Sequence, residues 1–247
     1  MSTRQSVRCG RMVARGSLLA ICALLACGLE LPAQKIHDEL LRRTPYDLLV
    51  IQVNEQTTEQ IQIEMLPFPD RKLPDFKRGS VLEVRLLDDP DEVYEVTWRD
   101  VASLQLYEQV LVGEVNQLVA QGRMDDAFEY YTFIRRRYPK APGLDESLER
   151  YLYLNAMKWF SEQRLLETLS LLEELYQRNP EYDHDSSGQA VASAIDAAAA
   201  RILNDYIEAG STLLAGQMMD RLIRTYGADQ LPSVQGAVNL LNQMAVA

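Results

Sequence analysis

From residue 107 onward the chain is dominated by helical periodicity, and three stretches of it align with one another without a gap: 120–139, 161–180 and 208–227. Each stretch has a small residue, a large apolar residue four places later, an aliphatic residue three places beyond, and a terminal proline or glycine. In order, these positions are Ala127, Thr168 and Ala215; Tyr131, Leu172 and Met219; Ile134, Leu175 and Leu222; and Pro139, Pro180 and Gly227. The shared pattern predicts three repeats of one helical unit that ends at its breaker residue.

Another helix precedes each of these stretches. Ahead of the first, Leu111, Val115, Leu118 and Val119 make one apolar face that ends before Gly122. We therefore predict three antiparallel helical hairpins and a terminal helix. Their ranges are 107–139, 148–180, 189–227 and 233–246, with loops at 140–148 and 179–188. A repeated helical unit buries its apolar face only against its neighbours, so such an array presents a surface suited to partners.

Before residue 107 the apolar period changes from helical to two, which is typical of half-buried strands. Asp and Pro at 88–91 have turn composition, so 81–98 is predicted to be a β-hairpin. The three prolines of 67–74 predict an extended connector, and 34–44 predicts a short helical lead-in. Five short strands within 45–106 favour a small SH3-like barrel, because closure removes the sheet edges. The predicted fold class is α+β.

The N-terminus has the features of an export signal. Four arginines precede the 14-residue apolar run 16–29, which is short for a bilayer-spanning helix. Two kinds of processing fit a signal peptide at 1–33: cleavage after Ala33, or lipidation of Cys27, since Leu24-Leu25-Ala26-Cys27 is similar to a bacterial lipobox. An uncleaved anchor is the third alternative. We expect an exported protein, periplasmic or attached to the outer face of the cell membrane.

Charge and cysteine content narrow the choice of partners. The chain has a formal net charge of -11, and without residues 1–33 it keeps 21 basic against 35 acidic residues, or -14. That charge opposes binding to nucleic acid or to anionic membranes. We expect contact with a membrane only through a lipid anchor or a transporter complex. All three cysteines lie in 1–33, so no disulfide framework or cysteine metal site is expected in the mature chain.

Few residues suggest chemistry. The two histidines are His37 in the lead-in and His184 in an acidic loop, which could ligate a metal but has the composition of a solvated loop between repeats. The acidic residues of 88–92 lack the alternating spacing of a calcium loop. Arg135-Arg136-Arg137 ends a helix, where cations offset the helix dipole. Phosphate-binding, hydrolase and metalloprotease motifs are absent from the sequence. We expect a protein that is not an enzyme and needs no cofactor or metal.

The helical pattern resembles the tetratricopeptide repeat (TPR). In that family the first helix of each hairpin, helix A, carries small and aromatic positions, which match Ala156 and then Leu118, Trp159 and Tyr206 here. The second helix, helix B, carries the aligned positions given above. The repeats are spaced by 41 and 47 residues instead of about 34, and the consensus tryptophan is replaced by Leu111, Leu152 and Ala199.

The order of modules supports a narrower resemblance. A leader, a β-module containing VLEVRLLDDPDEVYEVTW and a helical array containing LVAQGRMDDAFEYYTFIRRRYPKAPG resemble the N-terminal region of certain bacterial extracytoplasmic solute-binding proteins of ABC transporters. In those proteins a peptide-binding domain follows. Two functions are therefore expected: a non-catalytic scaffold that holds a protein or peptide partner outside the cytoplasm, or the adaptor segment of a transporter's solute-binding protein. No ligand-binding residue can be carried over.

The TPR resemblance implies that the A helices line a concave groove. The residues that match this groove are Gln109, Asn116, Arg150, Tyr153, Met157 and Asn204. Asn116 and Asn204 occupy the same repeat position, although ordinary solvated helix residues would give the same pattern. Substituting Asn116 or Tyr153 is expected to weaken partner capture with little loss of stability. The terminal helix has an apolar stripe, and Leu240 and Met244 on its other side favour a continued array or a docking site for another chain.

Overall fold

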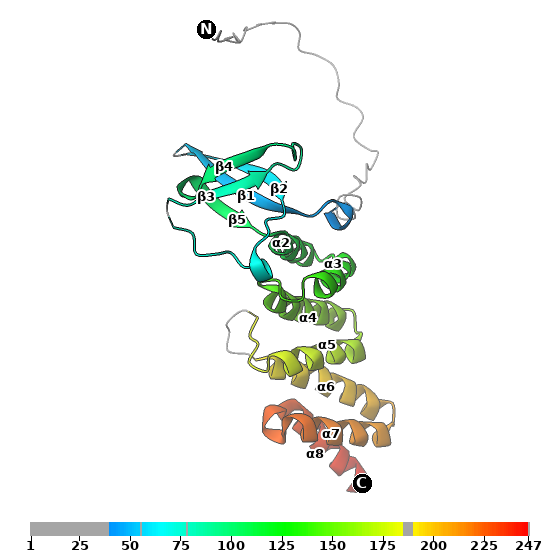
Figure 1. Cartoon of the computed structure of the whole chain (residues 1–247). Helices are drawn as coiled ribbons and strands as arrows, with labels where there is room; N and C mark the ends of the chain where they lie inside the picture. The colour runs from blue at the N-terminus through cyan, green and yellow to red at the C-terminus, as the bar shows by residue number, and fades with distance from the viewer. Residues whose placement is uncertain (1–39, 55, 78, 185–189, 247) are drawn as a thin grey trace, which may run out of the picture.

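The computed structural model describes residues 40–54, 56–77, 79–184 and 190–246. A β-module stands at one end of an elongated stack of helices, with α2 next to the strands and α8 at the far end (Figure 1). The fold is α+β, as predicted. The proposed signal peptide, including Cys27 and the lead-in residue His37, lies outside the described residues; residues 40–42 are helical.

The β-module contains two antiparallel sheets. Strands β1 (Tyr46–Asn54), β2 (Thr57–Glu64) and β5 (Val101–Gln105) form one sheet in the order β2-β1-β5, and β3 (Val81–Arg85) pairs with β4 (Val93–Thr97). The predicted hairpin at 81–98 is therefore confirmed. Leu49 and Ile63 are fully buried between the sheets, together with Leu82, Val84 and Leu104.

Over the described residues the strands do not close into a barrel. The two sheets are joined by one isolated bridge, Ile63 to Leu86, and by the hydrogen bond from the Leu87 N–H to the Gln62 carbonyl. The proline-containing connector, residues 65–80, separates β2 from β3 in the chain and includes the short 3-10 helix η1 (Pro69–Arg71). Prolines cannot donate to a ladder, and among the described residues the connector forms no strand of its own. Its last residue, Ser80, accepts the Trp98 N–H at 2.8 Å beside the β3–β4 pairing.

The helical array begins immediately after β5 and supplies the larger core. Its helices are α2 (Tyr107–Ala120), α3 (Met124–Arg137), α4 (Leu144–Ser161), α5 (Leu165–Arg178), α6 (Val191–Glu208), α7 (Thr212–Tyr226) and α8 (Pro232–Val246). Pairs α2/α3, α4/α5 and α6/α7 pack as successive hairpins. The aligned small residues Ala127, Thr168 and Ala215 are all fully buried, as are the aliphatic residues Ile134, Leu175 and Leu222.

The turn between the two helices of each hairpin is repeated in backbone detail. Gly122, Gln163 and Gly210 occupy equivalent positions with φ of 74°, 64° and 71°. At each turn the next residue donates its N–H to the carbonyl five positions earlier, which satisfies a carbonyl at the end of helix A. These bonds are Arg123 to Leu118 at 2.9 Å, Arg164 to Trp159 at 2.9 Å and Ser211 to Tyr206 at 2.8 Å.

The hairpins do not stack identically. At the first junction α4 packs more on α2 than on α3, whereas at the second junction α6 packs mainly on α5. Equivalent positions on the B helices consequently differ in burial: Leu169 of α5 is 3% exposed and Phe128 of α3 is 59% exposed. The array is therefore built from similar units joined in two different ways.

The second hairpin starts earlier than predicted. Residues 144–148 were expected in a loop and instead form the first turn of α4, after Gly143 with φ of 78°. Leu144 and Ser147 are buried, and Asp145 and Glu146 lie in the first turn, where acidic residues favour the helix N-terminus. Their polarity suggested a loop, but it suits a helix start.

The predicted terminal helix forms as α8 and packs against α6 and α7. Val234 is fully buried and Ala237 is 5% exposed, whereas Leu240 is 44% exposed on the other side. The sequence placed Pro232 and Ser233 at the helix start, and α8 begins at Pro232. The carboxylate that accepts its first-turn amides comes from Asp196 of α6.

Candidate interaction surface

The six residues predicted to line the groove come from the three A helices, α2, α4 and α6. We call Gln109, Asn116, Arg150, Tyr153, Met157 and Asn204 the helix A face. Arg150, Tyr153 and Met157 share one side of α4 through helical spacing. Arg150 and Asn204 are exposed, and Tyr153 and Met157 are half-buried. Helix α6 packs mainly on α5, α7 and α8, whereas α4 packs on α2. Asn204 of α6 is therefore not brought next to the face residues of α4 in the way that those of α2 are.

The side chain of Gln109 caps the N-terminus of α2. Its side-chain Oε1 accepts a hydrogen bond from the Leu106 N–H at 2.9 Å, which satisfies a donor at the helix N-terminus. The exposed part of its amide can still meet solvent, but its position is fixed by capping. Gln109 is thus a structural residue at the edge of the face.

Asn116 belongs to a network between the first two hairpins. Its Oδ1 accepts a hydrogen bond from Ser147 Oγ at 2.8 Å, and Tyr131 Oη lies 2.7 Å from the same Oγ. The Tyr131 hydroxyl also donates to the Ser147 carbonyl at 2.5 Å. Burial raises the pKa of Tyr131 well above its ordinary value, so this hydroxyl remains protonated. Asn116 therefore orders α4 against α2 and α3.

The same network ends in an unsatisfied polar atom. The rings of Tyr131 and Tyr151 are 5.1 Å apart, and Asn155 Nδ2 donates to the Tyr151 hydroxyl at 3.3 Å. Asn155 is 4% exposed, and among the described residues its Oδ1 has no hydrogen-bond partner. The position equivalent to Asn155 in the third hairpin is Ile202, which is buried in the core. The first hairpin has the polar residue Glu114 at this position, so only the third hairpin is apolar there.

Tyr153 is covered by the chain's own loop. The His184 ring stacks on the Tyr153 ring at 4.7 Å with an interplanar angle of 21°, and the Tyr182 ring is 5.8 Å from Tyr153. The Tyr182 hydroxyl and His184 Nδ1 are 3.1 Å apart. The loop after α5 thus packs aromatic residues onto the middle of the helix A face. The loop composition around His184 predicts a solvated segment, and His184 is exposed, but nothing in the sequence predicts its contact with Tyr153.

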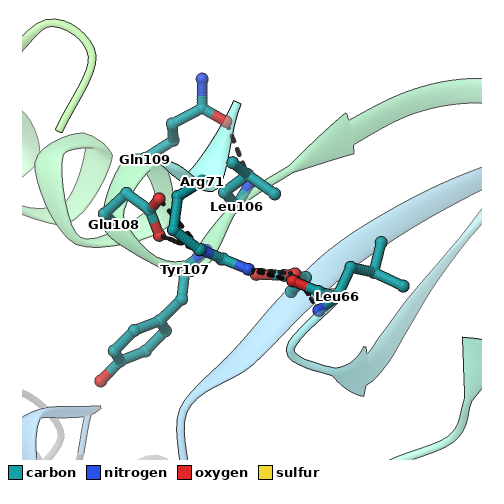
Figure 2. A network of polar contacts seen from close by, with 7 residues as sticks. Leu66, Arg71, Leu106, Tyr107, Glu108 and Gln109 are labelled. Atoms are coloured by element: carbon teal, nitrogen blue, oxygen red, sulfur yellow. Dashed lines mark hydrogen bonds and ion pairs between the residues drawn. The ribbon is translucent and has the colours of Figure 1, made fainter. Parts of the chain in front are cut away.

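A second polar cluster lies where the β-module meets the helical array, and sequence reasoning missed it (Figure 2). Arg71 of η1 points between Asp47 of β1 and Glu108 of α2. Its Nη2 is 2.5 Å from Asp47 Oδ1 and 3.0 Å from Glu108 Oε2. Its Nη1 donates to the Leu66 carbonyl at 2.8 Å. Burial alone would lower the pKa of Arg71, but hydrogen bonds and charges from both carboxylates raise it above its ordinary value.

Asp47 is fully buried and has three kinds of donor. Besides Arg71, it accepts the Leu66 N–H at 2.8 Å and the Tyr107 N–H at 2.9 Å. The last bond places a strand carboxylate at the N-terminus of α2, where the helix dipole favours negative charge. Nothing local in the sequence marks this cluster, because its three charged residues lie in a strand, a connector and a helix.

Other polar features are local. The Tyr94 hydroxyl donates toward Glu92 Oε2 at 3.0 Å and Asp89 Oδ2 at 3.2 Å within the β3–β4 turn, and these bonds, with Glu92 foremost, raise the pKa of Tyr94 to about 12. An open hollow of about 600 Å³ on α5 is lined by Ser170, Glu173, Glu174, Gln177 and Arg178. That hollow lies on a B helix and not on the helix A face.

The described residues contain no group of three or more His, Cys, Asp or Glu side chains placed to hold a metal ion. In the same part of the chain, every helix is too short or too polar to cross a membrane. Compared with models of known protein families, the chain matches none, and it matches no curated protein.

Proposed function

We propose that this chain is a non-catalytic, extracytoplasmic protein-interaction scaffold, with a TPR-like array of helical hairpins and an SH3-like β-module. The observation that carries the proposal is the equivalence of the three hairpins. Their A-to-B turns share one hydrogen bond and one left-handed backbone position, and their aligned small residues are all fully buried. Stacked units of this kind leave one side of each hairpin available to a partner. Here α4 packs on α2 whereas α6 packs mainly on α5, so the exposed A helices of the first two hairpins are neighbours and that of the third is set apart from them.

The helix A face is the surface we assign to the partner. Arg150 and Asn204 are exposed there, and Met157 is half-buried beside Tyr153. The face offers a cation at Arg150, an amide at Asn204 and apolar area at Met157, which fits a protein or peptide segment. The acidic balance of the chain disfavours nucleic acid. The predicted signal peptide at 1–33 is the reason for proposing an exported location.

The proposal is tested by photo-cross-linking in the native host. A benzophenone side chain is introduced at Arg150 or Asn204 on the A helices, and at Gln177 on α5 as the matched exposed control. We expect one defined protein adduct from the first two positions and none from the control. Equal adducts from all three positions, or adducts from Gln177 alone, would contradict the assigned surface. An adduct with a transporter permease would favour the alternative function, the adaptor segment of an ABC-transporter solute-binding protein.

A further inference from the structure

The joint between the β-module and the helical array has a linker of one residue. Strand β5 ends at Gln105 and α2 begins at Tyr107, so Leu106 alone separates them. Leu106 is 1% exposed, and its N–H is held by Gln109. A hinge needs residues whose φ and ψ can change. Leu106 is buried and hydrogen-bonded, so it is poorly suited to be one.

Contacts on either side of Leu106 cross the same joint. The ring of Tyr46, at the start of β1, lies 5.7 Å from the ring of Tyr107, and Tyr46 belongs to the core of the helical array. Asp47 accepts the Tyr107 N–H, so the first turn of α2 is capped by a residue of the β-module. The first two residues of β1 therefore contact the first turn of α2 directly.

Two buried carboxylates face each other across this joint. The side chain of Asp47 is fully buried and that of Glu108 is 3% exposed. Buried like charges repel strongly unless a cation lies between them. Arg71 is that cation, and its planar guanidinium hydrogen-bonds both carboxylates at once. It is delivered by the connector, where Asp70 and Arg71 both have left-handed backbones, with φ of 51° and 53°.

We propose that Asp47, Arg71 and Glu108 form a lock that holds the β-module and the helical array as one rigid body. The role of the connector is to place Arg71 between Asp47 and Glu108. The β-module and the helix A face would be presented at a fixed angle, so a partner that touches both meets a preorganised surface. This inference rests on the geometry of the joint and does not depend on the proposed function.

The test measures a distance distribution between the two modules by pulsed electron paramagnetic resonance. Spin labels are attached to cysteines introduced at Glu95 on β4 and Gln177 on α5, both exposed, in the full chain with Cys9, Cys22 and Cys27 replaced by serine. We expect one narrow distribution. Glu108→Gln should broaden or shift this distribution. The change removes the negative charge that pairs with Arg71 on α2, and it leaves the Asp47–Arg71 pair in the β-module.

Arg99→Gln is the matched control, since it removes the exposed Arg99–Asp100 ion pair inside the β-module and should leave the distribution unchanged. A broad distribution in the parent protein would overturn the rigid body. A distribution in Glu108→Gln as narrow as the parent's, at the same mean distance, would overturn the lock. If Glu108→Gln loses its far-ultraviolet circular dichroism, Arg71→Lys takes its place. Lysine keeps the charge without the planar guanidinium. A broader or shifted distribution in Arg71→Lys would support the lock, and one as narrow as the parent's at the same mean distance would overturn it.

Discussion

Asp196 caps a helix that begins more than thirty residues later: its Oδ1 accepts the Val234 N–H at 3.0 Å, joining the sixth residue of α6 to the first turn of α8. The same carboxylate accepts the Ser233 N–H at 2.9 Å. Asp196 is only 5% exposed. Asp47 does the same for α2 at the other end of the array. In both cases the cap comes from another element and ties that element to the helix.

Asp196→Ala is expected to destabilise the protein by about 1–3 kcal/mol, because two first-turn amides of α8 lose their acceptor in a buried place. Asp196→Asn keeps an acceptor oxygen and should lose less. Urea unfolding gives the free energy, and hydrogen exchange over 232–246 shows whether α8 opens first. Asp205→Ala, an exposed site on the same helix, is the control and should change stability by less than about 0.5 kcal/mol. Unaltered exchange in α8 would contradict the capping role.

Gln163→Gly is expected to stabilise the protein by about 0.5–1 kcal/mol. Gln163 has φ of 64° where the other two hairpins have glycine. A left-handed backbone costs a non-glycine residue about 1–2 kcal/mol, and the extra freedom of glycine in the unfolded chain offsets part of that gain. Urea unfolding of Gln163→Gly, with Gly122→Ala and Gly210→Ala as the reverse changes, measures this. The reverse changes should destabilise, and a loss of stability in Gln163→Gly would show that its side chain matters more than its backbone.

The hairpins could be predicted from the sequence because their signals are local. The spacing from Ala127 to Ile134 recurs in each repeat, and the same residues are buried in the structure. The start of α4 was misplaced because Asp145 and Glu146 are polar in a loop and in a helical first turn alike. Periodicity shows which residues face inward, and it leaves the exact helix ends undetermined.

The polar clusters could not be predicted in this way. Arg71 lies 24 residues from Asp47 and 37 from Glu108, and no pattern in the connector distinguishes it from the neighbouring Lys72. Asp196 offered a weak signal, since it is an acid within the otherwise apolar run at 194–200. The cover of Tyr153 by His184 depends on the path of a loop. Each of these contacts is set by tertiary packing, which residue spacing does not encode.

Alkaline pH is expected to destabilise the fold through buried tyrosines. Burial raises the pKa of Tyr107 and that of Tyr226 to about 12, against about 10 in an unfolded chain. The unfolded chain therefore loses these protons first, so the stabilisation is fully present below about pH 10 and is lost as the pH rises through 12. Tyrosinate absorbance should show a late-titrating group among the 12 tyrosines. Titration of all of them in one step near 10 in the folded protein would contradict this.

Export is expected to remove or modify the N-terminus. Cell fractionation with N-terminal sequencing should find a mature extracytoplasmic chain that starts near Gln34 or at a lipidated Cys27. Cys27→Ser separates the two, because it abolishes membrane attachment only if the cysteine carries the lipid. A cytoplasmic chain that begins at Met1 or Ser2 would contradict the extracytoplasmic assignment, whatever the helical array binds.

Asn116 and Asn204 share one repeat position and should nevertheless behave differently. Asn116 Oδ1 accepts the Ser147 Oγ hydrogen bond, whereas Asn204 is exposed. Asn116→Ala is expected to cost about 1 kcal/mol in urea unfolding, and Asn204→Ala less than about 0.5 kcal/mol. The sequence alone suggested that Asn116 could be removed with little loss of stability, and its contact with Ser147 argues against that. If Asn204→Ala reduces the cross-linking of a partner to position 150, the result can therefore be interpreted as lost binding. The same result from Asn116→Ala would also reflect a loosened junction between α2 and α4. Equal stability of the two variants would show that the Asn116–Ser147 bond contributes nothing to the fold.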